Sequence, residues 1–226
     1  MYKDTHILII EDDQEISKLL SLILNKLGLH STIAYSGTEG LLQLQNNHFD
    51  LILLDLMLPG KSGEEIITLI REKSNVPIIV ISAKVDINDK VHVLKIGADD
   101  YITKPFNQEE VIARIEVQLR KSSIAPKQST NTHWRGLKIN REKRVITLNT
   151  ETLHLTNAEY DILDLLINHP ERAFSKQEIY EKIWKGTYLG DDNTISVHVS
   201  NLRKKLAVIT EDEYIKTIWG VGFMLI

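Results

Sequence analysis

The sequence predicts an α/β protein in which a doubly wound domain with a five-stranded parallel sheet precedes a winged helix-turn-helix domain with an N-terminal antiparallel sheet. Five apolar runs, each followed by an amphipathic segment, predict the first domain, because strands buried on both faces lack polar alternation. Right-handed crossovers between such strands place helices on both faces of the sheet. After residue 132 the pattern of apolar and polar residues changes. It first predicts strands with alternating residues and then three amphipathic helices, and this change predicts the second domain.

The first domain is predicted to span residues 1–122 and to alternate strand and helix throughout. Its first helix shows the pattern clearly, since Ile16, Leu20 and Ile23 recur at helical spacing and Gly28 ends the segment. The predicted strands are residues 6–10, 31–35, 50–55, 77–82 and 100–103, and the later helices are residues 37–47, 63–73, 86–96 and 107–121.

A polar segment without hydrophobic periodicity, residues 123–132, is predicted to link the two domains. The second domain covers residues 133–226, and alternation over 136–155 predicts a small antiparallel sheet at its start. The remaining predicted elements are helices that begin at the capping boxes 156–159 and 175–178, a third helix over about 193–206, and a hairpin around Gly220 and Gly222.

The composition is that of a globular chain, with 42% hydrophobic and 26% charged residues. No apolar run is long enough to span a bilayer, and the N-terminus lacks the features of a signal peptide. The absence of cysteine excludes disulfides and thiolate metal sites, and these features together predict a cytoplasmic protein. The net charge of −4 combines −5 over residues 1–122 with +1 over the rest, so nucleic-acid binding would depend on a local basic patch.

Polar side chains follow four of the five predicted strands of the first domain. They are Glu11 and Asp12 after the first strand, Asp55 after the third, Ser82 at the end of the fourth and Lys104 after the fifth. The carboxyl ends of strands in a doubly wound sheet meet at one edge, where ligands bind, so we expect these side chains to lie together. Each of these side chains, taken by itself, has a simpler structural explanation. The acidic pair could start a helix, and the lysine could lie in a surface turn.

Three carboxylates at one point repel one another, and a divalent cation removes the conflict. A few protein ligands completed by water suit Mg²⁺, which commonly also binds oxygens of a phosphoryl group. We therefore predict that Asp55 is a nucleophile that accepts a phosphoryl group and is also a ligand of Mg²⁺. Glu11 and Asp12 are predicted to hold the same ion directly or through water. Lys104 would pair with a phosphoryl oxygen, and Ser82 would donate a hydrogen bond to it.

The segments that carry these residues, ILIIEDD, LLDLMLPG, VISA and GADDYITKPF, resemble the flavodoxin-like receiver domain of two-component response regulators. The resemblance implies that a histidine kinase phosphorylates Asp55 and that the backbone carbonyl of Met57 binds the metal. It also implies that Ser82 and Tyr101 switch conformation together and that the peptide bond before Pro105 is cis.

The resemblance further implies that phosphorylated receivers form a homodimer through the fourth helix, the fifth strand and the fifth helix. The alternative is that the charges there are ordinary solvated surface charges, and exposed ion pairs contribute little in either case. The implied pairs across the dimer are Lys90 with Glu110, Asp100 with Arg114, and Asp99 with Lys121.

The third helix of the second domain has the residue pattern of a helix that enters the major groove of DNA. An apolar stripe from Ile195 to Leu206 is predicted to face inward, and the opposite face carries small polar residues followed by Arg203 and Lys204. Such a face offers cations to phosphates and polar groups to base edges. The alternative is a solvated face whose terminal lysines complement the helix dipole.

Residues 133–226 resemble the DNA-binding domain of the OmpR/PhoB subfamily through LTNAEYDILDLL, SVHVSNLRKKL and IKTIWGVGF. The segment WKGTYLGDD matches the loop that contacts RNA polymerase in that subfamily. Trp219 stands where the wing often has arginine, so DNA binding is expected to be weak in the monomer. By resemblance, Val197, His198 and Asn201 face bases, whereas Ser200, Arg203 and Thr217 face phosphates.

Together these features predict a transcriptional regulator that is not an enzyme and that binds promoter DNA as a dimer once phosphorylated. One alternative is a phosphoaspartyl hydrolase of the haloacid-dehalogenase type, but such enzymes have a second aspartate where this chain has Met57. In another alternative the second domain binds RNA or protein, although the sequence has no aromatic pattern for stacking bases.

Overall fold

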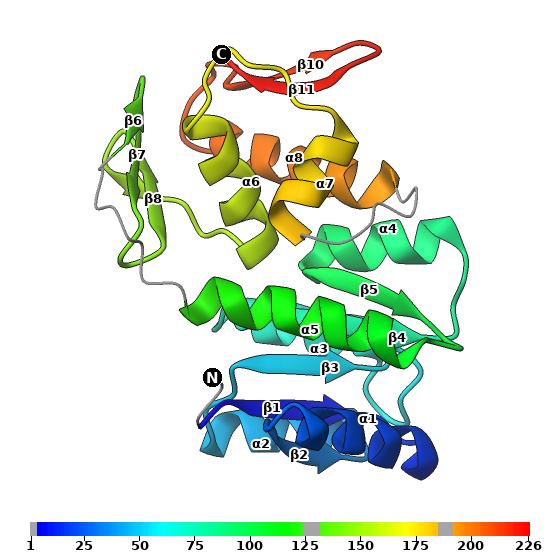
Figure 1. Cartoon of the computed structure of the whole chain (residues 1–226). Coiled ribbons are helices and arrows are strands. Elements are labelled where there is room, and N and C mark those ends of the chain that lie inside the picture. The colour runs from blue at the N-terminus through cyan, green and yellow to red at the C-terminus, as the bar shows by residue number, and fades with distance from the viewer. Residues whose placement is uncertain (1–3, 124–131, 185–191) are drawn as a thin grey trace. The chain divides into compact units, whose positions relative to one another are not determined.

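The computed structural model describes residues 4–123, 132–184 and 192–226 (Figure 1). The chain divides into two compact units, residues 1–122 and 123–226. Each unit has its own sheets and helices, so each is considered by itself. None of the described helices is long and apolar enough to cross a membrane.

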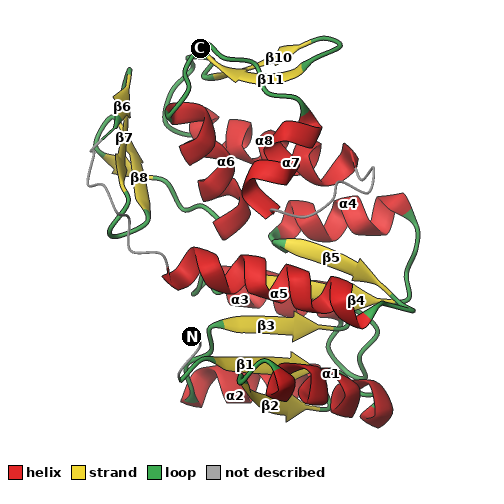
Figure 2. Cartoon of the chain, viewed as in Figure 1, coloured by secondary structure: helices red, strands yellow, loops and turns green. Residues whose placement is uncertain are grey.

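The first unit is a five-stranded parallel sheet with helices on both faces (Figure 2). The strand order is β2-β1-β3-β4-β5, so β1 and β3 are neighbours at the centre and their carboxyl ends meet. The strands are β1 (His6–Ile10), β2 (His30–Ala34), β3 (Leu51–Leu54), β4 (Ile78–Ser82) and β5 (Asp100–Thr103). The helices are α1 (Gln14–Lys26), α2 (Gly37–Asn46), α3 (Gly63–Arg71), α4 (Ile87–Ile96) and α5 (Gln108–Ser123).

The strands of this sheet are apolar on both faces, which explains why helices cover it on two sides. On one face, Ile9 of β1 lies in the same buried cluster as Leu24 of α1 and Ile115 of α5. On the other face, α2 packs so closely that a Cβ added at Gly40 would lie 2.5 Å from Ile10 Cδ1. Both faces of β1 are therefore fixed just before the chain enters the acidic segment.

In the part of the second unit that the structure describes, a four-stranded antiparallel sheet is followed by three helices and a two-stranded hairpin. Both predicted capping boxes form, between Thr156 and Glu159 at α6 and between Ser175 and Glu178 at α7. The sheet consists of β6 (His133–Trp134), β7 (Leu137–Asn140), β8 (Val145–Leu148) and β9 (Glu151–Thr152). The other elements are α6 (Asn157–Ile167), α7 (Lys176–Trp184), α8 (Asp192–Ala207), β10 (Ile215–Ile218) and β11 (Gly222–Leu225).

The predicted fold class and the order of elements are confirmed, and most boundaries agree within two residues. The largest difference is β6, which begins at His133 rather than at residue 136, because a two-residue strand is too short to show alternation. Most of the predicted linker lies outside the described residues.

Candidate functional site

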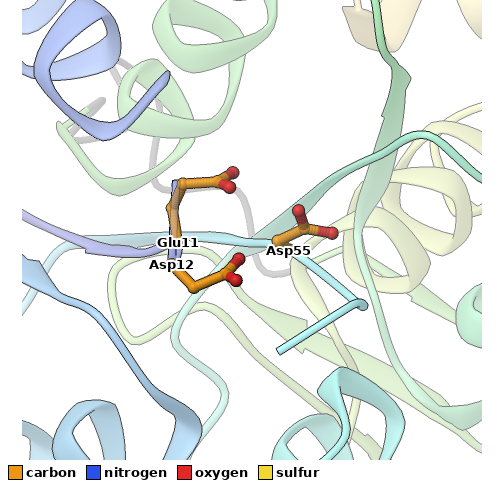
Figure 3. A group of neighbouring side chains, drawn as sticks. All are labelled: Glu11, Asp12 and Asp55. Atoms are coloured by element: carbon orange, nitrogen blue, oxygen red, sulfur yellow. The ribbon is translucent and has the colours of Figure 1, made fainter. Parts of the chain in front are cut away.

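The carboxyl ends of β1 and β3 bring three carboxylates into the same space (Figure 3). One oxygen from each of Glu11, Asp12 and Asp55 lies within 4.8 Å of the others. The backbone fixes this arrangement, because the N–H of Asp55 donates to the carbonyl of Ile10 at 3.0 Å. Glu11 and Asp55 are buried and Asp12 is exposed, so the cluster has a buried floor and opens to solvent on the side of Asp12.

Lys104 reaches the same cluster from the loop after β5. Its Nζ lies 2.7 Å from Glu11 Oε2 and 2.5 Å from Asp55 Oδ2. The peptide bond between Lys104 and Pro105 is cis, as predicted. A single ammonium group therefore bridges the two buried carboxylates.

Burial and neighbouring charges both act on the ionisable groups of the cluster. Burial raises the pKa of Glu11 to about 7, the hydrogen bond from Lys104 opposes this increase, and the charge of Asp55 adds to it. Burial alone would lower the pKa of Lys104, but hydrogen bonds to Asp55 and Glu11 raise it above its usual value. All three anionic donors are carboxylates, the ligands that Mg²⁺ prefers, so the donor set fits the predicted metal.

The third acid of the EDD segment has a different role. Asp13 caps α1, because its Oδ1 accepts hydrogen bonds from the backbone N–H groups of Glu15 at 2.8 Å and Ile16 at 3.0 Å. The bonds from Ile16 and Glu15 lower the pKa of Asp13. The helix-start explanation therefore applies to Asp13, whereas Glu11 and Asp12 belong to the carboxylate cluster.

Met57 orients the central carboxylate through its backbone. Its N–H donates to Asp55 Oδ1 at 3.0 Å, so the other oxygen, Oδ2, is the one beside Lys104. The Met57 side chain is exposed, which agrees with a role for its backbone rather than its sulfur. Metal binding by the Met57 carbonyl stays a prediction.

The predicted switch residues lie on neighbouring strands and are both buried. Ser82 ends β4, and the Tyr101 ring on β5 is only 2% exposed, so the ring points inward. The Tyr101 hydroxyl donates to the backbone carbonyl of Lys84 at 2.6 Å. Burial raises the pKa of Tyr101, which keeps this hydroxyl protonated. The role of Lys84 could not be predicted from the sequence, because a backbone acceptor has no side-chain signal.

Two known families match the chain, namely the response regulator receiver domain over residues 7–116 and the C-terminal domain of transcriptional regulatory proteins over residues 150–225. The response regulator ArlR of Staphylococcus haemolyticus is 39% identical over 221 residues, which are 98% of this chain and 99% of ArlR. The uncharacterized transcriptional regulatory protein YcbL of Bacillus subtilis is 38% identical over 223 residues, which are 96% of this chain and 99% of YcbL.

Solved structures resemble the whole chain. DrrB, described as an OmpR/PhoB homolog of Thermotoga maritima, is 27% identical with a TM-score of 0.53 and 98% of each chain covered. The chain belongs to the OmpR/PhoB subfamily of response regulators. A mutant of RitR is 26% identical with a TM-score of 0.78, covering 98% of this chain and 99% of RitR. This response regulator is therefore a phosphorylation-controlled transcriptional regulator with a receiver domain and a DNA-binding domain.

In the receiver domain, charges of the predicted dimer face are already engaged within one protomer. Arg114 Nη1 lies 2.7 Å from Asp100 Oδ1, and Arg114 Nε donates to Glu110 Oε1 at 3.0 Å. Lys90 Nζ lies 5.6 Å from the centre of the Tyr101 ring. Pairs across a dimer would therefore have to share or replace these contacts.

Asp99 differs from the exposed dimer-face residue that was expected. Its side chain is fully buried, and its Oδ2 accepts hydrogen bonds from Arg71 Nη2 at 2.8 Å and from the N–H of Ile78 at 2.9 Å. The side chain of its predicted partner, Lys121, lies outside the described part of the chain. These contacts hold the Asp99 carboxylate inside the receiver, and its pairing with Lys121 across a dimer stays a prediction.

In the DNA-binding domain, α8 departs from the predicted division into faces. Val197, His198 and Asn201, which were expected to face bases, are 5%, 1% and 7% exposed. Trp184 of α7 stacks on His198, with ring centroids 6.2 Å apart. Apolar periodicity identifies one buried stripe of a helix but not what covers its other sides, and base contacts by these three residues stay a prediction.

Arg203 connects α8 to the wing, which is the hairpin of β10 and β11. Its Nε donates to the carbonyl of Ile215 at 2.8 Å, and its Nη2 donates to Thr217 Oγ1 at 2.8 Å. These bonds engage Arg203 and Thr217 inside the domain, where phosphate contacts had been predicted. Ser200 is half-buried and Lys204 is exposed, so these two residues of α8 remain available to a ligand.

The wing is anchored through β11 and exposed at its tip. Phe174 and Phe223 exchange two backbone hydrogen bonds, of 2.8 and 2.9 Å, which pin β11 to the segment before α7. At the tip, the Trp219 side chain is 92% exposed. The loop predicted to contact RNA polymerase lies almost entirely outside the described residues.

Proposed function

We propose that Asp55 accepts a phosphoryl group from a partner histidine kinase and that this event controls promoter binding by the second domain. The observation that carries the proposal is the carboxylate cluster in which Lys104 lies 2.7 Å from Glu11 and 2.5 Å from Asp55, beside the exposed Asp12. Mg²⁺ bound there supplies positive charge for the transferred phosphoryl oxygens.

In the transfer, Asp55 Oδ2 attacks the phosphorus of a phosphohistidine. A P–O bond forms as the P–N bond breaks, and the kinase histidine leaves with the electron pair. The N–H of Met57, 3.0 Å from Asp55 Oδ1, holds the carboxylate in position for the attack. Lys104 stays beside the phosphoryl group as a counter-charge, and Glu11, Asp12, Asp55 and the Met57 carbonyl would hold the metal.

Phosphorylation then shifts the balance between two positions of Tyr101. The Ser82 hydroxyl donates to a phosphoryl oxygen, and Tyr101 occupies the inward position, where its hydroxyl bonds the Lys84 carbonyl at 2.6 Å. The state with Tyr101 inward is the one that forms the homodimer. The pairs proposed across that dimer are Lys90 with Glu110 and Asp100 with Arg114.

Two DNA-binding domains joined in a dimer gain effective concentration for adjacent half-sites on double-stranded promoter DNA. Lys204 and Ser200 of α8 are proposed to contact backbone phosphates, because they are not buried. Arg203 and Thr217 position the wing, and Trp219 at its tip packs into the minor groove.

RNA polymerase is the proposed further partner, and the cytoplasm is the proposed location. The chain is proposed to have no enzymatic activity of its own, because Met57 stands where a phosphoaspartyl hydrolase needs a second acid. Incubation with small phosphate esters tests this last point. A single turnover that leaves Asp55 phosphorylated agrees with the proposal, whereas multiple turnover would contradict it.

Binding-site selection on random duplex DNA tests whether phosphorylation controls DNA binding. The full chain is used in Mg²⁺, with or without beryllofluoride as a phosphoryl mimic. We expect sequences with two half-sites, enriched more strongly when beryllofluoride is present. The Asp55→Asn variant should enrich the same sequences weakly under both conditions. Equal enrichment by the wild type with and without beryllofluoride would rule out control by phosphorylation.

A further inference from the structure

Lys84 makes three contacts that connect the switch residues to a different helix. It lies in the connection between β4 and α4, two residues after Ser82. Its carbonyl accepts the Tyr101 hydroxyl at 2.6 Å, and its N–H points to Ser82 Oγ at 3.4 Å. Its Nζ lies 2.9 Å from Oε1 of Glu64, in the first turn of α3. The same residue therefore contacts both predicted switch residues and the helix that follows the Asp55 loop.

The Lys84–Glu64 ion pair is partly shielded from water, since the two side chains are 33% and 24% exposed. The hydrogen bond to Glu64 raises the pKa of Lys84. Burial would raise the pKa of Glu64, but the hydrogen bond from Lys84 brings it below its usual value. Both groups are therefore charged near neutral pH, and the pair links two segments that are 20 residues apart in the sequence.

The position of Glu64 is itself well determined. It follows Gly63, whose N–H donates to the carbonyl of Leu56 at 3.1 Å. A Cβ at Gly63 would lie 2.7 Å from the carbonyl oxygen of Asp55, so the start of α3 packs directly on the phosphoacceptor loop. Lys84 therefore pairs with a glutamate whose backbone is held beside the Asp55 loop, rather than with a mobile side chain on the surface.

In its inward position, Tyr101 uses the carbonyl of Lys84 as a hydrogen-bond acceptor. Tyr101 is 2% exposed, and a buried hydroxyl that loses an acceptor is costly, so the inward position is favoured when the Lys84 carbonyl is in place. We propose that Glu64 and Lys84 are positioning residues, whose ion pair holds the β4–α4 connection where its carbonyl accepts Tyr101 and thereby favours the inward state. This inference rests on the proposed switching by phosphorylation and adds the groups that set how readily it occurs.

The test measures the position of Tyr101 in the full chain labelled with 3-fluorotyrosine, by fluorine NMR during a beryllofluoride titration in Mg²⁺. The Tyr101 signal is identified by its absence in Tyr101→Phe. We expect Lys84→Met and the milder Glu64→Gln to lower the ratio of inward to outward Tyr101 about two- to fivefold, as the loss of a partly shielded ion pair predicts. More beryllofluoride should then be needed for half-maximal dimer formation.

Two further variants separate the ion pair from general effects. Exchanging the charges, with Glu64→Lys and Lys84→Glu together, should restore the wild-type ratio. Lys73→Met removes the same charge from an exposed position at the other end of α3 and should change nothing. The inference is overturned if Lys84→Met leaves the ratio unchanged, or if the exchange fails to restore it in a chain with wild-type thermal stability.

These outcomes differ from failure of the proposed function. If beryllofluoride moves neither the wild-type Tyr101 signal nor the dimer equilibrium, phosphorylation does not drive the switch at all. If the wild type responds and the Lys84 and Glu64 variants respond identically to it, the switch exists but does not depend on this ion pair.

Discussion

The carboxylate cluster and helix α8 were both predicted from side-chain patterns, but the structure places all the predicted side chains together in the cluster and only some of them at the surface of α8. In the receiver domain, Glu11, Asp12 and Asp55 converge within 4.8 Å, as the strand ends predicted. In the DNA-binding domain, Val197 and His198 are buried although the helical pattern placed them outside. The two regions differ because backbone topology determines the first arrangement, whereas side-chain packing determines the second.

Strand pairing alone determines where the residues of the carboxylate cluster lie. Ile10 of β1 pairs with Leu54 of β3, so the residues that follow these two strands must be neighbours. Nothing comparable determines the outer sides of a helix, because exposure there depends on which other elements pack against it. Strand ends are therefore a more reliable guide to a site than the apparently polar face of a helix.

The largest predicted effect is at the centre of the pocket. Asp55→Asn removes the nucleophilic oxygen, so we expect complete loss of covalent phosphate after incubation with acetyl phosphate and Mg²⁺, measured by mass spectrometry of the intact chain. The matched control is Asp13→Asn, which changes an acid of the adjacent segment that only caps α1. Asp13→Asn should be phosphorylated normally, because asparagine is also a good cap. Phosphate on Asp55→Asn would show that the acceptor is elsewhere.

The second prediction concerns the dimer. Arg114→Glu places a negative charge beside Asp100 and Glu110, which now contact Arg114 within 3.0 Å. We expect this variant to remain monomeric with beryllofluoride at concentrations where the wild type dimerises, as measured by sedimentation velocity. Asp55 chemistry should be unaffected, so phosphorylation by acetyl phosphate is the internal control. Normal dimer formation by Arg114→Glu would show that the proposed face is wrong.

Some features of the receiver and of the DNA-binding domain could be predicted from the sequence, and others could not. The element order, the carboxylate cluster and Lys104 followed from strand ends and from the resemblance to receivers. The buried Asp99–Arg71 pair and the role of Lys84 could not be predicted, because they depend on how α3 and the loops around it pack. The involvement of Arg203 with the wing was missed for the same reason, since an arginine on a basic helix usually suggests phosphate.

Two glycines of the wing test how firmly the DNA-binding domain is packed. A Cβ at Gly222 would lie 2.0 Å from the carbonyl oxygen of Phe174, and the backbone there has φ +156°. Gly222→Ala should therefore lower the free energy of unfolding by roughly 2–4 kcal/mol. Gly220 has φ +75° but an open surrounding, so Gly220→Ala should cost only about 1 kcal/mol. Thermal unfolding of the full chain compares them, and equal losses would mean that the wing is not pinned at Phe174.

A smaller effect separates the exposed from the buried residues of α8. Lys204 is exposed, so Lys204→Ala should weaken DNA binding on all sequences and reduce the slope of log affinity against log salt by about one. Asn201 carries no charge, so Asn201→Ala should leave that slope unchanged. Fluorescence anisotropy with a selected duplex at several salt concentrations measures both. An unchanged slope for Lys204→Ala would remove this lysine from the proposed interface.

The smallest effect is expected at the wing tip, where an exposed indole offers a flat apolar surface and one N–H donor. In the minor groove, A·T pairs present only acceptors, whereas the amino group of guanine is a donor that would face the indole N–H. We therefore expect the wild type to prefer A·T over G·C by roughly fivefold at the position that Trp219 contacts, the low end of the effect of one base pair. Trp219→Ala should lose this preference and keep the others.

Inosine makes the wing-tip test independent of the major groove. An inosine·cytosine pair lacks the minor-groove amino group but presents the same major-groove groups as G·C. Replacing guanine by inosine at the base pair that Trp219 contacts should therefore raise the affinity of the wild type to its affinity for A·T. The same replacement should not change the affinity of Trp219→Ala. If inosine behaves like guanine for the wild type, the preference is read in the major groove. The wing tip would then contribute no sequence information through the minor groove.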